Sequence, residues 1–393
     1  MPDQLSFFDS PAGISALALP FDYQQAIADW SSLRKRMVRE VPGEFTRDEW
    51  AYLVTFLESD NLYSPFLAAF GSAVSDSPQS PNLLYRPRGP IAVWLPNNVS
   101  LLGPLTLILL SLTGQAIRLK LGSSAQDLTG AFLTYAVEHL PDGEFRKYLA
   151  TQVKTEIFDR EDARQKDLAV QSRVRVVFGS DAAAESIHQL PHPLESLGFS
   201  FVDRQSEAWL EKGAVNEQVL TTLIKVFAIY GQAGCTSPKR VILLRGSETE
   251  VQQLRNDLLD LWPGVISAET PMHTASSNVM AEQWARALGW DARRARKSSA
   301  MLANGPLDAN AFEAPMALRI QGASREQALA NLPHNIQTIG HALEDAGDPS
   351  WLKLLAGSRV RRFVPLDHMH HFGSIWDGQE FWRQCFEPME FQS

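Results

Sequence analysis

Cys235 is the residue with the clearest potential for covalent chemistry in this 393-residue sequence. It lies in the polar, glycine-flanked segment GQAGCTSP, between a predicted helix over 216–230 and a predicted strand over 240–244. Small neighbours leave a thiol and backbone N–H groups accessible, so a thiolate here can attack a carbonyl while a loop N–H helps to hold the oxyanion. A buried, unreactive cysteine is the alternative, because free cysteines frequently pack as small apolar residues.

Three histidines near the C-terminus, in the segment DHMHH, form a second candidate site. On a strand, His368 and His370 would point to the same face and could bind a metal together, with His371 beside them. No further cluster of cysteine or histidine has matching spacing. We therefore expect no metal, and interpret the segment as a wall of the active site or a surface turn.

The elements expected around these residues alternate between strand and helix. Short apolar, β-rich runs at 91–95, 117–121 and 174–178 predict buried strands, and each is followed by a helical pattern. This order is typical of a doubly wound, largely parallel sheet. The charged stretch 154–167 is expected to be a solvated helix or an insertion.

Composition excludes several classes of protein. With 36 basic and 45 acidic residues the net charge is −9, which argues against a nucleic-acid partner. Two cysteines cannot form a disulfide framework, and the N-terminus has no basic region typical of a signal peptide. The longest apolar run, 101–112, is far shorter than the ~20 residues that span a bilayer. We expect a cytoplasmic protein with no membrane span.

The common nucleotide and hydrolase fingerprints are missing. No G-x-G-x-x-G or G-x-x-x-x-G-K-S/T follows a strand, and H-E-x-x-H and G-x-S-x-G do not occur. A sheet of this kind would have to bind a nucleotide through strand ends and helix N-termini.

The segment around Cys235 resembles the nucleophile block Q-x-x-C-x-S-P of the acyl-CoA reductases typified by the fatty-acid reductase of bacterial bioluminescence (LuxC). Gln232, Cys235, Ser237 and Pro238 carry the match. Further similar blocks follow the family's order between about residues 88 and 380; they are IAVWLPNNVS, IRLKLGSS, VRVVFGSDAAAESIHQLP, PHNIQTIGHAL and RVRRFVPLDHMHHFGSIWDG. Asp367 departs from the pattern, because it replaces the usual glycine after V-P-L.

The resemblance implies an α/β fold of the aldehyde dehydrogenase superfamily, whose cofactor domain lacks G-x-G-x-x-G. A Rossmann-type domain binding a nicotinamide cofactor would span 86–204, and an α/β catalytic domain would span 205–358. We expect a mostly helical segment over 1–85, with a capping box from Thr46 to Glu49, and a C-terminal segment over 359–393 that packs back on both domains.

The resemblance also implies catalytic roles. Cys235 would accept the acyl group from a thioester, and Asn98 would place its side-chain amide beside the oxyanion. The alternative for Asn98 is a helix N-cap. A glutamate that activates water in aldehyde-oxidising relatives has no counterpart in register, because Glu195 in ESLGFS is one residue displaced. Reduction of a thioester needs no activated water, so this departure favours a reductase.

Four residues would bind the cofactor by the same resemblance. Lys120 would meet the adenosine ribose or its 2′-phosphate, with Ser123 as a companion, and Gly179 and Ser180 would form the turn against the pyrophosphate. The alternatives are an exposed lysine at a strand end and a simple strand–helix turn. We expect NADPH, with NADH as a possibility that the residues leave open.

The resulting functional hypothesis is NADPH-dependent reduction of an acyl thioester to an aldehyde through an S-acyl-Cys235 intermediate. The donor would be acyl-CoA, an acyl-carrier protein or an acyl-transferase partner, and the chain could form a homo-oligomer. Alternatives are a non-catalytic or acyl-transfer subunit, and a CoA-acylating dehydrogenase that runs in the oxidative direction.

A basic cluster closes the segment 275–300, which is expected to be helical. It comprises Arg293, Arg294, Arg296 and Lys297. These residues could dock an acidic carrier protein or the phosphates of CoA, but a solvated helix face is the favoured interpretation.

Overall fold

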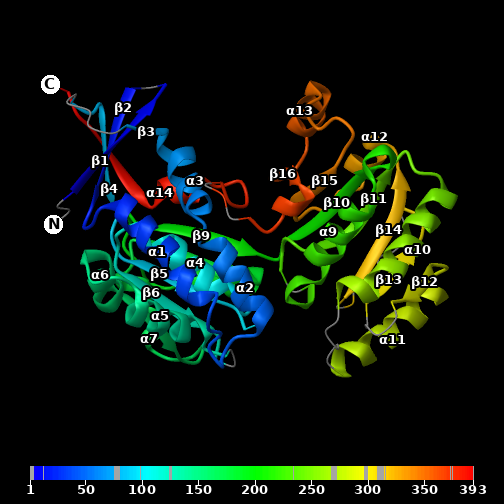
Figure 1. Ribbon diagram of the computed structural model, residues 1–393, viewed down its shortest axis with the longest axis horizontal. Helices are drawn as coiled ribbons and strands as arrows, with labels where there is room; N and C mark the ends of the chain where they lie inside the picture. Colours follow the sequence, from blue (N-terminus) through cyan, green and yellow to red (C-terminus); the bar gives the residue numbers. More distant parts are fainter. Residues whose placement is uncertain are drawn as a thin grey trace. The chain divides into compact units, whose positions relative to one another are not determined.

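The computed structural model divides the chain into two compact units, whose elements are labelled in Figure 1. The first unit is Met1–Val202 with Gly373–Ser393, and the second is Asp203–Phe372. The structure describes residues 4–11, 13–74, 80–97, 99–123, 126–232, 234–266, 272–295, 300–307, 314, 316–371, 373 and 375–392.

A five-stranded parallel sheet forms the centre of the first unit. Its order is β7 (Val153–Ile157), β6 (Ile117–Leu121), β5 (Ile91–Trp94), β8 (Val174–Gly179) and β9 (Leu197–Val202). The chain runs from β5 outward through β6 to β7 and then returns to the other side of β5 with β8. The carboxyl ends of β5 and β8 therefore form a switch point, where open α/β sheets bind ligands.

The three strands predicted in this region are confirmed, and two more occur. The prediction for 154–167 is wrong at its start, because β7 occupies Val153–Ile157 and α7 begins only at Arg164. Glu156 of β7 forms an ion pair with Arg118 of β6 at 2.6 Å. The charge that suggested a solvated segment is therefore neutralised by the neighbouring strand.

Helices cover this sheet. They are α4 (Leu102–Ser111), α5 (Leu128–His139), α6 (Glu144–Gln152), α7 (Arg164–Gln171) and α8 (Asp181–His188). Nine of the ten residues of α4 are buried, from Gly103 to Ser111, which explains why its sequence contains no charged residue and is mostly apolar. None of the helices among the described residues is both long and apolar enough to span a membrane.

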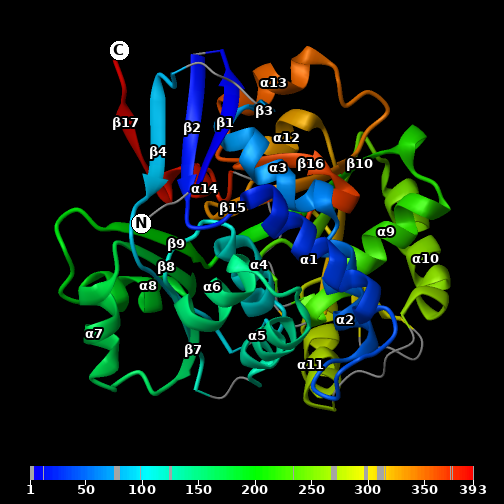
Figure 2. The same cartoon turned by 60° about the vertical axis from the view of Figure 1, so that its left-hand side comes forward.

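The two ends of the chain share a second sheet in the first unit, and Figure 2 shows its strands next to one another. Its order is β17 (Phe386–Glu390), β4 (Leu83–Pro87), β2 (Gly13–Leu19), β1 (Gln4–Ser10) and β3 (Ser72–Val74). Its helical neighbours in the sequence are α1 (Tyr23–Met37), α2 (Arg47–Phe56), α3 (Ser59–Phe70) and α14 (Phe381–Gln384). The capping box of α2 is confirmed, since Thr46 and Glu49 bond reciprocally. The strands β1, β2 and β3 within 1–85, and β4 across its end, were not predicted.

A seven-stranded sheet forms the second unit. Its order is β12 (Asp291–Arg294), β13 (Met301–Asn304), β14 (Ala317–Ala323), β11 (Pro238–Leu244), β10 (Gln205–Glu211), β15 (Ile336–Ala342) and β16 (Arg362–Pro365). All neighbours are parallel except the pair β12 and β13. The helices are α9 (Glu217–Ala228), α10 (Glu248–Val265), α11 (Met272–Ala287), α12 (Arg325–Ala330) and α13 (Pro349–Ala356). Short 3-10 turns are η1 (Lys212–Ala214), η2 (Ile229–Gln232) and η3 (Leu366–His368).

The structure corrects the helix predicted over 275–300. Helix α11 ends at Ala287, and the edge strand β12 follows. Arg293 and Arg294 lie on this strand rather than on a helix face, while Arg296 and Lys297 lie outside the described residues. The sequence did not predict this short strand because two of its four residues are arginines. They are tolerated at the edge of the sheet because both side chains remain exposed.

Candidate active site

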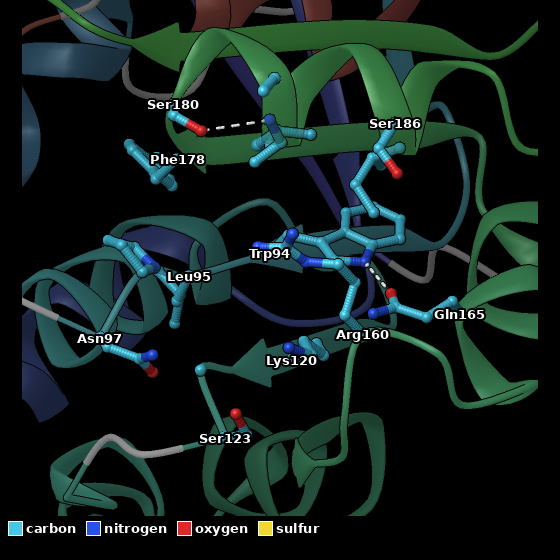
Figure 3. A pocket seen from close by; sticks show the side chains of 17 residues that line it. Trp94, Leu95, Asn97, Lys120, Ser123, Arg160, Gln165, Phe178, Ser180 and Ser186 are labelled. Atoms are coloured by element: carbon cyan, nitrogen blue, oxygen red, sulfur yellow. Dashed lines mark hydrogen bonds between the residues drawn. The ribbon is translucent and has the colours of Figure 1, made fainter.

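A pocket of about 280 Å³ lies in the first unit at the carboxyl ends of β5, β6 and β8 (Figure 3). It brings together all four residues that sequence analysis assigned to a cofactor, namely Lys120, Ser123, Gly179 and Ser180. No carboxylate occurs among the described residues that line it. The pocket is therefore placed at the switch point of the sheet and is suited to a phosphate-bearing ligand.

The turn from β8 into α8 provides one wall. Gly179 has φ +147°, a conformation that strains any residue with a Cβ. Ser180 caps α8, since its Oγ accepts the N–H of Ala183 at 3.2 Å. Unpaired N–H groups and the helix dipole favour an anion at such an N-terminus, so this turn fits a pyrophosphate.

Two cations lie next to each other on the opposite side of the pocket (Figure 3). Lys120, at the end of β6, is buried rather than exposed, and its Nζ lies 5.5 Å from the centre of the Phe158 ring. Burial and the charge of Arg160 lower the pKa of Lys120, while Asp159 partly opposes this. A bound phosphate would relieve the repulsion between the two cations.

Sequence analysis missed Arg160 because the charged stretch that contains it suggested a solvated surface. A second missed residue is Gln165 of α7, whose Oε1 accepts the indole N–H of Trp94 at 2.7 Å. This bond fixes the Trp94 ring as an apolar wall of the pocket (Figure 3).

Cys235 lies in the second unit, in the loop between η2 and β11, and its side chain is half-buried. Its carbonyl oxygen accepts the hydroxyl of Ser206, on β10, at 2.7 Å. The loop is thus attached to β10, an interior strand of the sheet, while Cys235 stays partly accessible to solvent.

Gln232 anchors the same loop from the other side. Its side chain is 1% exposed and its backbone has φ +64°, which is rare for a residue other than glycine. The amide donates to the carbonyls of Pro238 at 3.2 Å and Ala317 at 2.9 Å, and accepts the N–H of Ala317 at 3.1 Å. The family block contains this glutamine, and the structure gives it a positioning role.

A buried histidine connects the cysteine loop to the segment after β16. His370 Nε2 lies 2.9 Å from the carbonyl of Val226, which can only accept, so Nε2 carries the proton. Nδ1 therefore accepts the hydroxyl of Thr236 at 2.6 Å. Burial lowers the pKa of His370 to about 4, so the ring is neutral near pH 7.

Arg362, the first residue of β16, is the most informative residue that sequence analysis missed. It stands in one row across the sheet with Ser206 and Thr338, which pair in register on β10, β15 and β16. Its guanidinium donates to the carbonyls of His368, Met369 and His371, at 3.2, 3.1 and 2.9 Å.

The charge of Arg362 interacts with the cysteine. Burial lowers the pKa of Arg362, and the negative charge of the Cys235 thiolate raises it. The same attraction acts in reverse and favours the thiolate form of Cys235. The arginine of the family's R-x-V-P-L block was a signal that could have identified this residue.

Solved structures with the same fold include an aldehyde dehydrogenase from Bartonella henselae, with TM-score 0.61 and 10% identity over 93% of this chain and 84% of that chain. An indole-3-acetaldehyde dehydrogenase from P. syringae gives TM-score 0.65 and 10% identity, over 95% and 84%. A benzaldehyde dehydrogenase from Corynebacterium glutamicum gives TM-score 0.63 and 12% identity, over 94% and 84%.

The family model described as acyl-CoA reductase (LuxC) matches residues 74–265. The chain is LuxC-like, with an aldehyde dehydrogenase fold. None of the curated proteins matches its sequence. The predicted family resemblance and fold class are confirmed, and the family model that matches describes an oxidoreductase.

The remaining site predictions for this LuxC-like chain have different outcomes. Asn98 lies outside the described residues. Glu195 is in the first unit, where its exposed carboxylate pairs with Arg173 at 3.1 Å. The histidine segment does not continue the strand that would place His368 and His370 on one face, because β16 ends at Pro365 and His368 lies in the 3-10 turn η3. No group of three or more potential metal ligands occurs in the described part of the chain.

Proposed function

We propose that this LuxC-like chain reduces an acyl thioester to an aldehyde through an S-acyl-Cys235 intermediate, with NADPH as the preferred reductant. The observation that carries the proposal is the cysteine loop itself. Hydrogen bonds of Ser206 and Gln232 hold the backbone of this loop, and the half-buried Cys235 interacts electrostatically with Arg362.

The chain's own residues perform the covalent steps of the proposed reaction. The Cys235 thiolate forms a bond to the thioester carbon, and the tetrahedral adduct expels the donor's thiolate, which leaves the acyl group on Sγ. Loop N–H groups and, in this proposal, the amide of Asn98 stabilise the oxyanion. After reduction of the acyl carbon, the adduct expels Cys235 again as a thiolate and releases the aldehyde.

The residues of the pocket fit a dinucleotide. The α8 N-terminus at Gly179 and Ser180 would hold the pyrophosphate, and Lys120 with Arg160 would hold the adenosine ribose. An acidic residue at the end of the second strand is typical of NAD sites, whereas cations there suit the 2′-phosphate of NADP. When bound, the reduced nicotinamide supplies the hydride.

The covalent step is tested by intact-protein mass spectrometry after incubation with acyl-CoA, with and without NADPH. The protein should gain one acyl group, which Cys235→Ala abolishes and NADPH discharges as aldehyde. An acyl group that persists with NADPH would indicate an acyl-transfer subunit. Production of acyl-CoA from aldehyde, CoA and NAD+ at a higher rate than the reverse would favour the oxidative alternative.

Cofactor preference is tested separately. Arg160→Gln should lower kcat/KM for NADPH about 10-fold, because one charge-assisted contact to a phosphate is lost, and leave NADH nearly unchanged. Arg164→Gln is the matched control, because Arg164 is exposed and paired with Asp162. Equal losses with both cofactors would contradict the proposed role of Arg160.

A further inference from the structure

A second cavity, of about 290 Å³, lies wholly in the second unit. We call it the basic pocket, and its polar side chains are those of Arg204, His334, Asn335, Ser358, Arg359 and Arg361. Three arginines and a histidine around one cavity create a positive potential that attracts anions. No carboxylate is among the described residues that line it.

The backbone around the basic pocket is fixed by hydrogen bonds. The N–H of Arg361 donates to the carbonyl of Gln337 at 3.0 Å, and the N–H of Val360 donates to the Ser358 hydroxyl at 3.2 Å. The guanidinium groups of Arg359 and Arg361, in contrast, have no hydrogen bond or ion pair within the described part of the chain. Planar guanidinium groups that have no internal partner are well suited to bind phosphate oxygens.

The basic pocket and Cys235 lie along the same edge of the sheet. The pocket surrounds the amino ends of β10, β15 and β16, and Cys235 is three residues ahead of Pro238, at the amino end of β11. These strands are neighbours in parallel register, in the order β11, β10, β15 and β16. At ~4.8 Å between strands, the edge from β11 to β16 spans roughly 14 Å.

We propose that the basic pocket binds the phosphate at the far end of a phosphopantetheine arm whose thioester is presented to Cys235. From phosphorus to sulfur the arm has about 13 bonds, as many as a little over four extended residues, so it reaches roughly 15 Å and can span the edge. The inference rests on the proposed function, since it names the donor's chemistry. Free CoA and the prosthetic group of a carrier protein share this phosphate.

Binding of small fragments tests the pocket without turnover. Titration calorimetry with 4′-phosphopantetheine and with pantetheine compares the wild-type chain with Arg359→Gln/Arg361→Gln. The double variant should bind 4′-phosphopantetheine about 10- to 100-fold more weakly and pantetheine equally well. The control Arg293→Gln/Lys353→Gln removes the same charge from exposed positions elsewhere in the second unit and should bind like wild type. Equal affinity of wild type and the pocket variant for 4′-phosphopantetheine would overturn the inference.

Acylation of Cys235 then identifies the source of the arm. If free CoA is the donor, Arg359→Gln/Arg361→Gln should need a higher concentration of acyl-CoA for half-maximal S-acylation. If a carrier protein is the donor, the same variant should need a higher concentration of acyl-carrier protein. Unaltered concentrations for both donors would overturn the inference and leave the proposed function intact. Absence of any S-acyl-Cys235 would refute the proposed function, while the phosphopantetheine titration would still report on the pocket.

Discussion

Removing the charge of Arg362 should raise the pH at which Cys235 becomes reactive. The perturbation is Arg362→Gln, which keeps a side chain able to donate hydrogen bonds to the carbonyls after η3 but loses the positive charge. The thiolate would then lack the favourable interaction that the structure records between these two residues.

The magnitude follows from the row of in-register residues. Arg362 is two strands from Ser206, and the Ser206 hydroxyl binds the Cys235 carbonyl at 2.7 Å. Two strand spacings of ~4.8 Å suggest a charge separation of roughly 10 Å, for which Coulomb's law with an effective dielectric constant of about 20 gives roughly 1.7 kcal/mol. Because Cys235 is half-buried and solvent screens part of this energy, we expect the reactive midpoint to move upward by about 1 pH unit.

The assay is the rate of alkylation by iodoacetamide, a neutral reagent, measured between pH 6 and pH 10. Cys385 supplies little background, because it is fully buried and burial raises its pKa to about 12. Cys235→Ser measures whatever background remains.

Two further variants separate charge from structure. Arg362→Lys keeps the charge and should leave the midpoint close to that of wild type, and the exposed Arg293→Gln should behave as wild type. An unchanged midpoint in Arg362→Gln, or equal shifts in the glutamine and lysine variants, would refute the electrostatic reasoning.

Three other predictions concern single side chains. The folded state should lose stability as the pH falls from 6.5 towards 4, because the unfolded chain protonates His370 and the folded chain keeps it neutral. The free energy of unfolding in urea should fall by about 1.4 kcal/mol at pH 5.5, and His370→Gln should reduce this loss. Gln232→Leu should destabilise the protein by about 2–3 kcal/mol in the same assay and slow Cys235 alkylation, since it leaves the buried N–H of Ala317 without its partner. Gly179→Ala should cost about 1–2 kcal/mol of backbone strain and weaken NADPH binding in a fluorescence titration, and wild-type affinity would contradict the importance of its φ of +147°.

Strands whose two faces are both buried were predictable from the sequence. The central strand β5 consists of unbroken apolar residues, and its neighbour β8 is apolar except for Arg175 and the terminal Gly179. β10 escaped prediction because its sequence, QSEAWLE, contains the buried Glu207. That carboxylate is paired with Arg240 of β11 at 2.5 Å, a long-range partner that no local pattern shows.

The candidate site was predictable where function depends on strand ends. Residues that follow parallel strands meet at one edge, so Lys120 and Gly179 converge in one pocket although 59 positions separate them. Arg160 and Arg362 were not predicted, because only the folded chain brings them to their sites. Arg160 reaches the pocket from a loop, and Arg362 approaches Cys235 from a strand distant in the sequence. The family resemblance includes the block that contains Arg362, but it does not show that the charge of this arginine acts on Cys235.

The pairing of β17 with β4 has a consequence for biosynthesis. The strand β4 emerges from the ribosome about 300 residues before its partner, because the whole second unit is encoded between them. At ~5–20 residues per second, one edge of the terminal sheet stays open for roughly 15–60 s while the inserted unit is completed. An open edge invites pairing with other nascent chains, so folding of this protein should depend on chaperone protection during translation more than its final topology suggests.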